Sequence, residues 1–217
     1  MKIKDHKLDQ MMKGSPPPIE FQVTLENWRK YPYTTWSFAN VRNLIPTAQI
    51  ETNISNRISF QIDLTSFENL NIKHEDNFYK FYDVLKNCNA DAFLVMHKGK
   101  LIFEYFDNFT SKNTPHIIFS VSKSLTSLLA ATLFKNMSID VNKTVSSIIP
   151  ETKDTAYEDA TIRNVLDMNV ASGFIEDYSG KAEIFKKYRS CTGWDLPEES
   201  LQNIPVGLHD FFKKPRS

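Results

Sequence analysis

The sequence predicts an α+β fold, an α/β sandwich in which an antiparallel sheet is flanked by helices. Two apolar runs, residues 91–97 and 100–106, are joined by a short turn at Gly99 and predict a β-hairpin. Apolar residues spaced by three and four positions predict helices over 75–87 and over 120–137. Both hairpin runs are almost continuously apolar, so we expect both faces of the sheet to be covered.

Residues 1–70 are predicted to form an arm that packs on the body of the protein. Three consecutive prolines at 16–18 favour an extended path. A series of rings follows, and a free linker would not carry so many, so we interpret them as anchors. These rings are Trp28, Tyr31, Tyr33, Trp36 and Phe38. The body is predicted to span residues 71–217.

The remaining elements of the body are shorter. A segment over 145–149 ends at Pro150, and Thr161 is expected to cap a helix over 162–168. Residues 173–200 show no clear periodicity, and residues 201–212 are interpreted as a short helix.

Composition argues against several classes of function. The 217 residues carry no net charge, so nothing favours binding to nucleic acid or to an acidic membrane surface. The first residues hold no apolar signal segment, and no run of about 18 apolar residues could span a membrane. Cys88 and Cys191 lack the spacing of a disulfide framework, which favours a cytoplasmic location. The five histidines are scattered, so we expect no metal and no cofactor.

A Ser-x-x-Lys motif, Ser120 to Lys123, stands at the start of the 120–137 helix. Residues three apart on a helix are neighbours, so the hydroxyl and the amine can touch. We predict a buried helix whose apolar wall desolvates the amine, which favours the uncharged form that can take the serine proton. About one or two such motifs arise by chance in a chain of this composition, so the bare pattern is weak. A helix start with capping serines and a solvated lysine is the alternative interpretation.

Five stretches, in order along the chain, support a more specific interpretation. They are Gly14–Pro18 with the Trp28–Phe38 region; DAFLVMHKGKLIFEYF; Phe119–Ser124; Val165–Met168; and Ser172 through Tyr178. Together they resemble the serine beta-lactamase-like hydrolases, which include class C beta-lactamases and penicillin-binding proteins, and most of all the 6-aminohexanoate-dimer hydrolase branch. The resemblance implies that fold, with Ser120 as nucleophile and oxyanion-hole N–H donor and Lys123 as its base. It also implies that Tyr178 lies over the substrate amide, accompanied by Asp177; an exposed loop aromatic is the equally weighted alternative for Tyr178.

Two family motifs are not found downstream of Ser120: a Tyr-x-Asn-like loop and a Lys-Thr-Gly-like strand. Tyr157 lies too early, Tyr188 lacks the asparagine, and residues 191–193 follow Ser120 too closely. The sequence is therefore expected to represent the N-terminal portion of the family domain, a truncated form that lacks its C-terminal strands. The predicted function is hydrolysis of a small amide or ester substrate through a Ser120 acyl-enzyme. The alternatives are an impaired fragment, completed by a second copy or by a partner chain, and a binding-only homologue.

Overall fold

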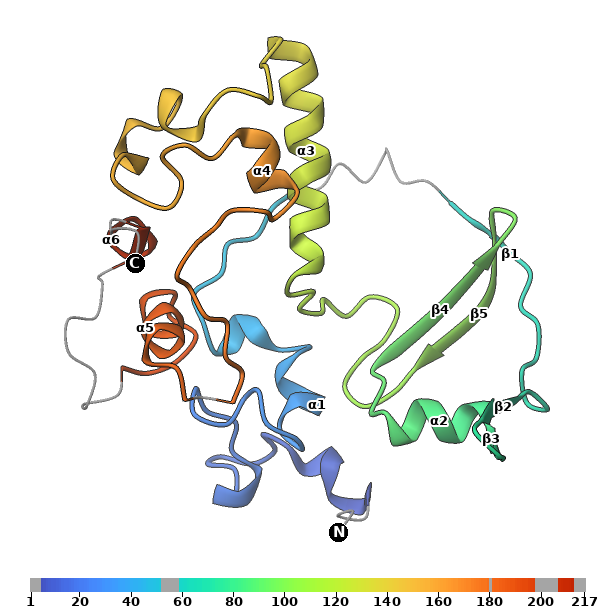
Figure 1. Cartoon of the computed structure of the whole chain (residues 1–217). Coiled ribbons are helices and arrows are strands. Elements are labelled where there is room, and N and C mark those ends of the chain that lie inside the picture. Colours follow the sequence, from blue (N-terminus) through green and yellow to red (C-terminus); the bar gives the residue numbers. More distant parts are fainter. Residues whose placement is uncertain (1–4, 52–58, 180, 198–206, 213–217) are drawn as a thin grey trace. The chain divides into compact units, whose positions relative to one another are not determined.

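The computed structural model describes residues 5–51, 59–179, 181–197 and 207–212. The chain divides into two compact units, residues 1–117 and 118–217 (Figure 1). The first unit holds the aromatic arm and the sheets, and the second holds the helix that follows Ser120. The division does not test the predicted arm boundary at residue 70, which stays a prediction.

The predicted hairpin is confirmed and forms the centre of a three-stranded sheet. β4 (Ala92–His97) and β5 (Lys100–Phe106) pair antiparallel, and β1 (Gln61–Ile62) adds to β5 in parallel, giving the order β1-β5-β4. The register shifts between Val95 and Met96, which marks an irregularity in β4. Lys98 and Gly99 form the turn with φ values of 49° and 75°, the left-handed pair that matches strand twist in a two-residue hairpin.

One face of this sheet packs on α2 (Phe81–Asn87). Phe81, Leu85 and Phe103 are buried together, and the Phe81 and Phe103 rings meet edge to face with centroids 5.3 Å apart. The expectation that both faces are covered is wrong for the described chain. Leu94 and Met96 of β4 stay 52% and 49% exposed, because the part of the chain that the structure describes leaves their surface open.

The helix predicted over 75–87 begins later than expected. β2 (Asn71–His74) and β3 (Asn77–Lys80) form a second antiparallel hairpin, and α2 starts only at Phe81. Phe78, which lies within the predicted helix, belongs to β3 and is 71% exposed. Residues 77–80, which helical spacing alone assigned to a helix, therefore form a strand that pairs with β2.

The aromatic arm builds its own small core around Trp28, which is 1% exposed. The arm contains α1 (Thr34–Ser37) and short 3-10 helices at Asp5–Gln10, Ile19–Phe21 and Val41–Asn43. The rings of Trp28 and Phe38 meet edge to face, and the Phe38 carbonyl accepts a hydrogen bond of 2.9 Å from the Ile117 N–H. That bond ties the arm to the end of the first unit.

The second unit is helical in its described part. It contains α3 (Val121–Met137), α4 (Ile162–Leu166), α5 (Glu183–Cys191) and α6 (Leu208–Phe212), with 3-10 turns at Val145–Ser147 and Pro150–Thr152. Thr161 caps α4 through a reciprocal capping box with Asn164, as predicted. Among the described helices, none is long and apolar enough to cross a membrane.

The sequence prediction missed α5, which lies in the stretch judged to have no periodicity. Ile184, Tyr188 and Cys191 are spaced by four and three positions, a signal that could have indicated a helix. Residues 201–206 of the predicted last helix lie outside the described residues, and α6 begins at Leu208.

The hairpin turn gives a test of local conformation. Gly99→Ala should lower the free energy of unfolding by about 1 kcal/mol, because its φ of 75° disfavours a side chain although the space around it is open. Gly207→Ala is the matched control, since its surroundings are equally open and its φ is not left-handed. Denaturant unfolding measures both variants, and equal losses would contradict the role of the turn.

Candidate active site

The turn that leads into α3 brings Ser120 and Lys123 together. Lys123 Nζ donates a hydrogen bond to Ser120 Oγ over 3.0 Å, so the contact expected from their spacing is present. Ser120 does not cap α3 with its side chain, which leaves its hydroxyl oriented toward the amine. The same separation suits proton transfer from the hydroxyl to the amine whenever the amine is uncharged.

The backbone around Ser120 is held in an unusual conformation. Phe119, directly before it, has a φ of 40°, which costs a non-glycine residue about 1–3 kcal/mol. Hydrogen bonds close the turn: the Val121 N–H donates to the Ile118 carbonyl and the Ser122 N–H donates to the Phe119 carbonyl. The Ser120 N–H has no hydrogen-bond acceptor in the described part of the chain, so it is available to a ligand oxygen at the start of α3.

The prediction of a buried helix is wrong for the described structure. No residue of α3 is buried, and Leu125, Leu128 and Leu129 are 58%, 68% and 61% exposed. Apolar residues do recur at helical spacing along α3, but the described residues supply no layer that covers them. The wall expected to desolvate Lys123 is therefore not provided by this part of the chain.

Tyr178 lies in the loop before α5 and is 75% exposed. Its hydroxyl donates a hydrogen bond to the Glu176 carboxylate, and its ring meets the buried Phe185 ring edge to face with centroids 5.1 Å apart. The phenol therefore has an anchor on α5 and a polar partner in its own loop. Sequence reasoning had named neither Glu176 nor Phe185 as a partner of Tyr178.

Asp177 organises the same loop. Its carboxylate oxygens accept hydrogen bonds from the backbone N–H groups of Ser179, Lys181 and Ala182 over 2.8–2.9 Å. Hydrogen bonding, first from the Ser179 side chain and then from these N–H groups, lowers the pKa of Asp177 to about 2. The contacts describe a structural carboxylate at the entrance to α5, and a substrate-binding role for Asp177 stays a prediction.

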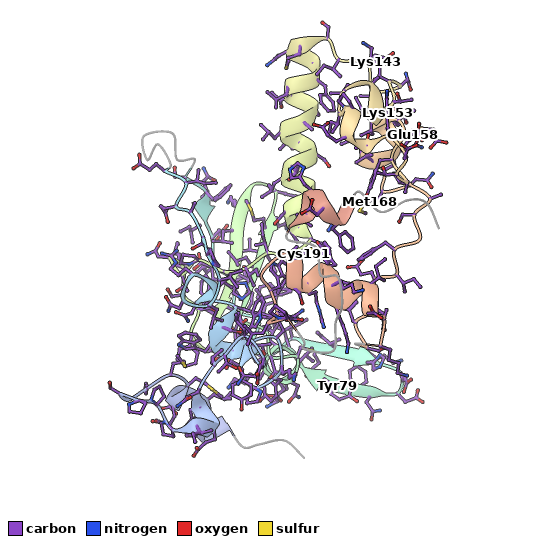
Figure 2. All side chains as sticks on the ribbon, turned by 90° about the vertical axis from the view of Figure 1, so that its left-hand side faces the viewer. Tyr79, Lys143, Lys153, Glu158, Met168 and Cys191 are labelled. Carbon is purple, nitrogen blue, oxygen red and sulfur yellow. The ribbon has the colours of Figure 1, made fainter. Side chains whose placement is uncertain are left out.

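α5 carries the main aromatic cluster of the second unit. Phe185 and Tyr188 stack with their planes 11° apart, and Phe174 and Phe211 pack against Tyr188 from the neighbouring segments. Burial, followed by the nearby Cys191 thiol, raises the pKa of Tyr188 above its usual value. Tyr188 thus contributes to the packing of α5. Figure 2 labels Cys191, the last residue of this helix.

α5 and a residue just after its end contact both the Tyr178 loop and the residue before Ser120. Phe185 near its beginning contacts Tyr178, and Trp194 just after its end contacts Phe119, with ring centroids 5.7 Å apart. The structure therefore brings Ser120 together with Lys123 directly, and connects both to the Tyr178 loop through α5.

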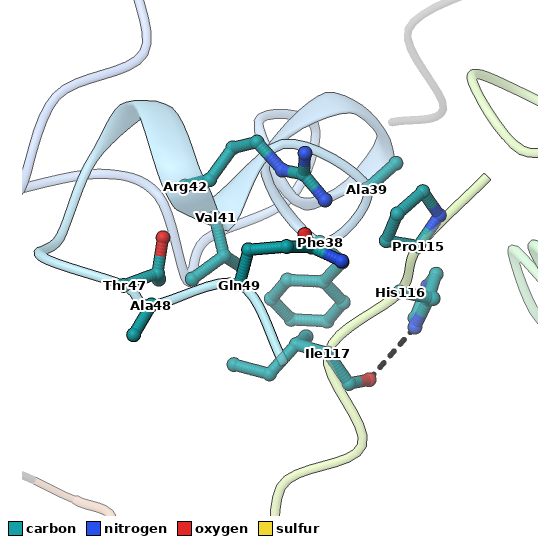
Figure 3. Close-up of a pocket in the computed structure, with 10 residues that line it drawn as sticks. All are labelled: Phe38, Ala39, Val41, Arg42, Thr47, Ala48, Gln49, Pro115, His116 and Ile117. Carbon is teal, nitrogen blue, oxygen red and sulfur yellow. Dashed lines mark hydrogen bonds between the residues drawn. The ribbon is translucent and has the colours of Figure 1, made fainter. Parts of the chain in front are cut away.

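A separate cavity of about 330 Å³ lies in the first unit (Figure 3). Phe38, Arg42, Gln49 and His116 are among its lining residues, and none of the predicted site residues is. The His116 ring nitrogens lie 2.7 Å from the Ile117 carbonyl oxygen and 2.9 Å from an Asp91 carboxylate oxygen. In the described residues, no group of three His, Cys, Asp or Glu side chains could hold a metal ion.

An α+β domain with a serine-lysine pair at the start of its long helix has the features of a serine-hydrolase-type protein. The chain belongs to the Beta-lactamase family, whose model matches residues 83–196. This membership confirms the predicted family and gives general support to a hydrolase-type function.

Comparison with individual proteins agrees with this assignment. The chain is 27% identical over 178 residues to the 6-aminohexanoate-dimer hydrolase of Paenarthrobacter ureafaciens, an alignment covering 80% of this chain and 43% of that protein. It is similar in fold to a solved structure assigned as a 6-aminohexanoate-dimer hydrolase from Bacillus anthracis. The TM-score is 0.81 at 22% identity, over 92% of this chain and 53% of that one. The predicted fold class is confirmed, and the chain spans about half the length of the relatives it matches.

The lowered pKa of Asp177 predicts that the stability of its loop depends on pH. Its pKa is lowered in the folded chain, so its stabilising contribution is present above the ordinary value of about 3.9 and is lost as pH falls through about 2. We expect amide exchange at Lys181 and Ala182 to accelerate in Asp177→Asn at pH 6, and to differ progressively less from wild type as pH falls toward 2.

Asp76→Asn, at an exposed carboxylate in the β2–β3 turn, is the control for removing one negative charge. Exchange at Lys181 and Ala182 that responds equally to both substitutions would contradict the loop-organising role of Asp177.

Proposed function

We propose that the protein is a serine hydrolase of amide or ester bonds that acts through an acyl-enzyme on Ser120. The observation that supports this most directly is the 3.0 Å contact between Lys123 Nζ and Ser120 Oγ at the start of α3. An amine at that distance can serve as general base for the hydroxyl, which is otherwise a weak nucleophile.

The proposed chemistry is a two-step acyl transfer. Uncharged Lys123 accepts the Ser120 proton while Oγ bonds to the substrate carbonyl carbon, and the Ser120 N–H donates to the developing oxyanion. The carbon–nitrogen or carbon–oxygen bond then breaks, and the proton held by Lys123 passes to the leaving group, with Tyr178 hydrogen-bonding the leaving atom. Water then bonds to the acyl carbon and gives a proton to Lys123, which passes that proton to Ser120 Oγ as the carbon–Oγ bond breaks and the acid is released.

The substrate class follows from the relatives. Both matched proteins are named as 6-aminohexanoate-dimer hydrolases, so a linear amide of 6-aminohexanoate is the first substrate to test. Small esters are the second class, because the acyl-transfer chemistry is shared.

We further propose a cytoplasmic location. In the described part of the chain Cys88 and Cys191 take part in no disulfide, which supports it.

Reaction with a fluorophosphonate tests the nucleophile. We expect the probe to form one adduct on Ser120, which peptide mapping can locate. The adduct should be absent in Ser120→Ala. Lys123→Met should slow the reaction by about 10²- to 10⁴-fold, because the general base is removed.

Ser122→Ala and Lys135→Met, which alter the neighbouring serine and another lysine of α3, should react like wild type. An unmodified Ser120, or an adduct that forms equally fast without the Lys123 amine, would contradict the proposal.

We also propose that the exposed stripe of α3 is covered by a layer equivalent to the part of the matched relatives with which this chain does not align. A long helix with an apolar stripe is normally buried, and no α3 residue is buried here. The relatives contain about as much chain again beyond the matched part. Without that cover we expect this chain to react with the probe once and to turn substrate over poorly, which is the impaired alternative.

Dye binding tests this second proposal. The chain should bind a hydrophobic dye, and Leu128→Ser combined with Leu129→Ser should reduce the fluorescence, because both side chains are exposed on α3. Met168→Ser, at an apolar side chain that is 75% exposed outside α3, is the control and should change it little. A homodimer by analytical ultracentrifugation that binds no dye would instead show a second copy on α3.

A further inference from the structure

We propose that Trp194 is a positioning residue for Ser120 and acts through Phe119. The proposal rests on the proposed function of Ser120, and it adds a residue from the far end of α5 to that site. The Trp194 ring meets the Phe119 ring edge to face, with centroids 5.7 Å apart and planes at 68°.

Phe119 controls the backbone that presents Ser120. Its φ of 40° lies in the left-handed region, which bulky residues leave unless their surroundings hold them there. A rotation of φ at Phe119 to a negative value would swing Ile118 away from Val121. The hydrogen bond from the Val121 N–H to the Ile118 carbonyl, 2.9 Å, would then break. Ser120 lies inside that turn, so its backbone would lose the constraint.

Trp194 is itself fixed on the end of α5. Gly193 adopts a φ of 73°, as in many helix C-termini, and the Trp194 N–H donates to the Arg189 carbonyl over 3.0 Å. Arg189 Nε and an Asp195 carboxylate oxygen form an ion pair at 2.8 Å, with side chains only 17% and 21% exposed. These contacts fix the backbone that carries the indole, so the indole can pack steadily against the Phe119 ring.

A packing role alone would change stability and leave the Ser120–Lys123 pair unaltered in the folded chain. A positioning role changes the reactivity of Ser120 in protein that remains folded. The Tyr178 loop offers an internal comparison, because Phe185 anchors it at the other end of α5 and should not respond to a change at Trp194.

The first experiment measures the second-order rate of Ser120 phosphonylation. We expect Trp194→Ala to lower this rate by about 10- to 100-fold and Trp194→Phe to restore most of it, since a ring remains against Phe119. Trp36→Phe, at another half-buried tryptophan located in the first unit, is the matched control and should be unchanged. Equal rates for Trp194→Ala and wild type, at equal folded fraction by circular dichroism, would overturn the proposal.

A double-mutant cycle tests the route through Phe119. Phe119→Gly removes the ring and accepts positive φ without strain, so adding Trp194→Ala to it should change the rate no further. A full Trp194→Ala effect in the Phe119→Gly background would show that Trp194 does not act through Phe119.

A second readout separates this proposal from the function it rests on. In Ser120→Cys, the introduced thiol lies beside Lys123, and an adjacent ammonium favours the thiolate. The pH midpoint of its alkylation by iodoacetamide, resolved from Cys88 and Cys191 by peptide mapping, should rise when Trp194→Ala is added. If wild-type Ser120 fails to react with the phosphonate, the hydrolase proposal fails, while this shift still supports positioning; an unshifted midpoint would overturn positioning whatever Ser120 does.

Discussion

The hydrogen bond between Lys123 and Ser120 is the contact on which the functional interpretation depends. It exists because two side chains three residues apart share one face of α3, and because Ser120 does not use its hydroxyl to cap the helix. The strained Phe119 and the hydrogen bonds of the preceding turn hold the serine at that point. Local backbone geometry thus brings the two side chains into contact.

The same region shows what the pair lacks. The apolar stripe of α3 is open in the described structure, and the Lys123 side chain at the start of the helix is exposed as well. The chain spans about half of the relatives it matches, and we have proposed that an equivalent of their unmatched part covers this stripe. The geometry of the nucleophile and its environment are therefore separable properties in this chain, and experiments can address each one.

Features encoded by neighbouring residues were predictable from the sequence. The β4–β5 hairpin follows from its turn residues, the α4 cap from Thr161, and the Ser120–Lys123 contact from helical spacing. Features set by distant packing were not. α2 begins only at Phe81, because the residues before it pair as strands. The contact between Phe119 and Trp194 joins residues 75 positions apart in the sequence. Periodicity carries no information about which layer covers an apolar stripe, so the exposure of α3 could not be foreseen.

The central claim is that Ser120 forms an acyl-enzyme assisted by Lys123. The most direct measurement is mass-spectrometric mapping of the chain after brief exposure to an activated acetate ester at neutral pH. We expect an acetyl group on the oxygen of Ser120 that disappears in Lys123→Met. Acetylation confined to surface lysine amines, or a Ser120 acetyl group that forms equally well without the Lys123 amine, would contradict it.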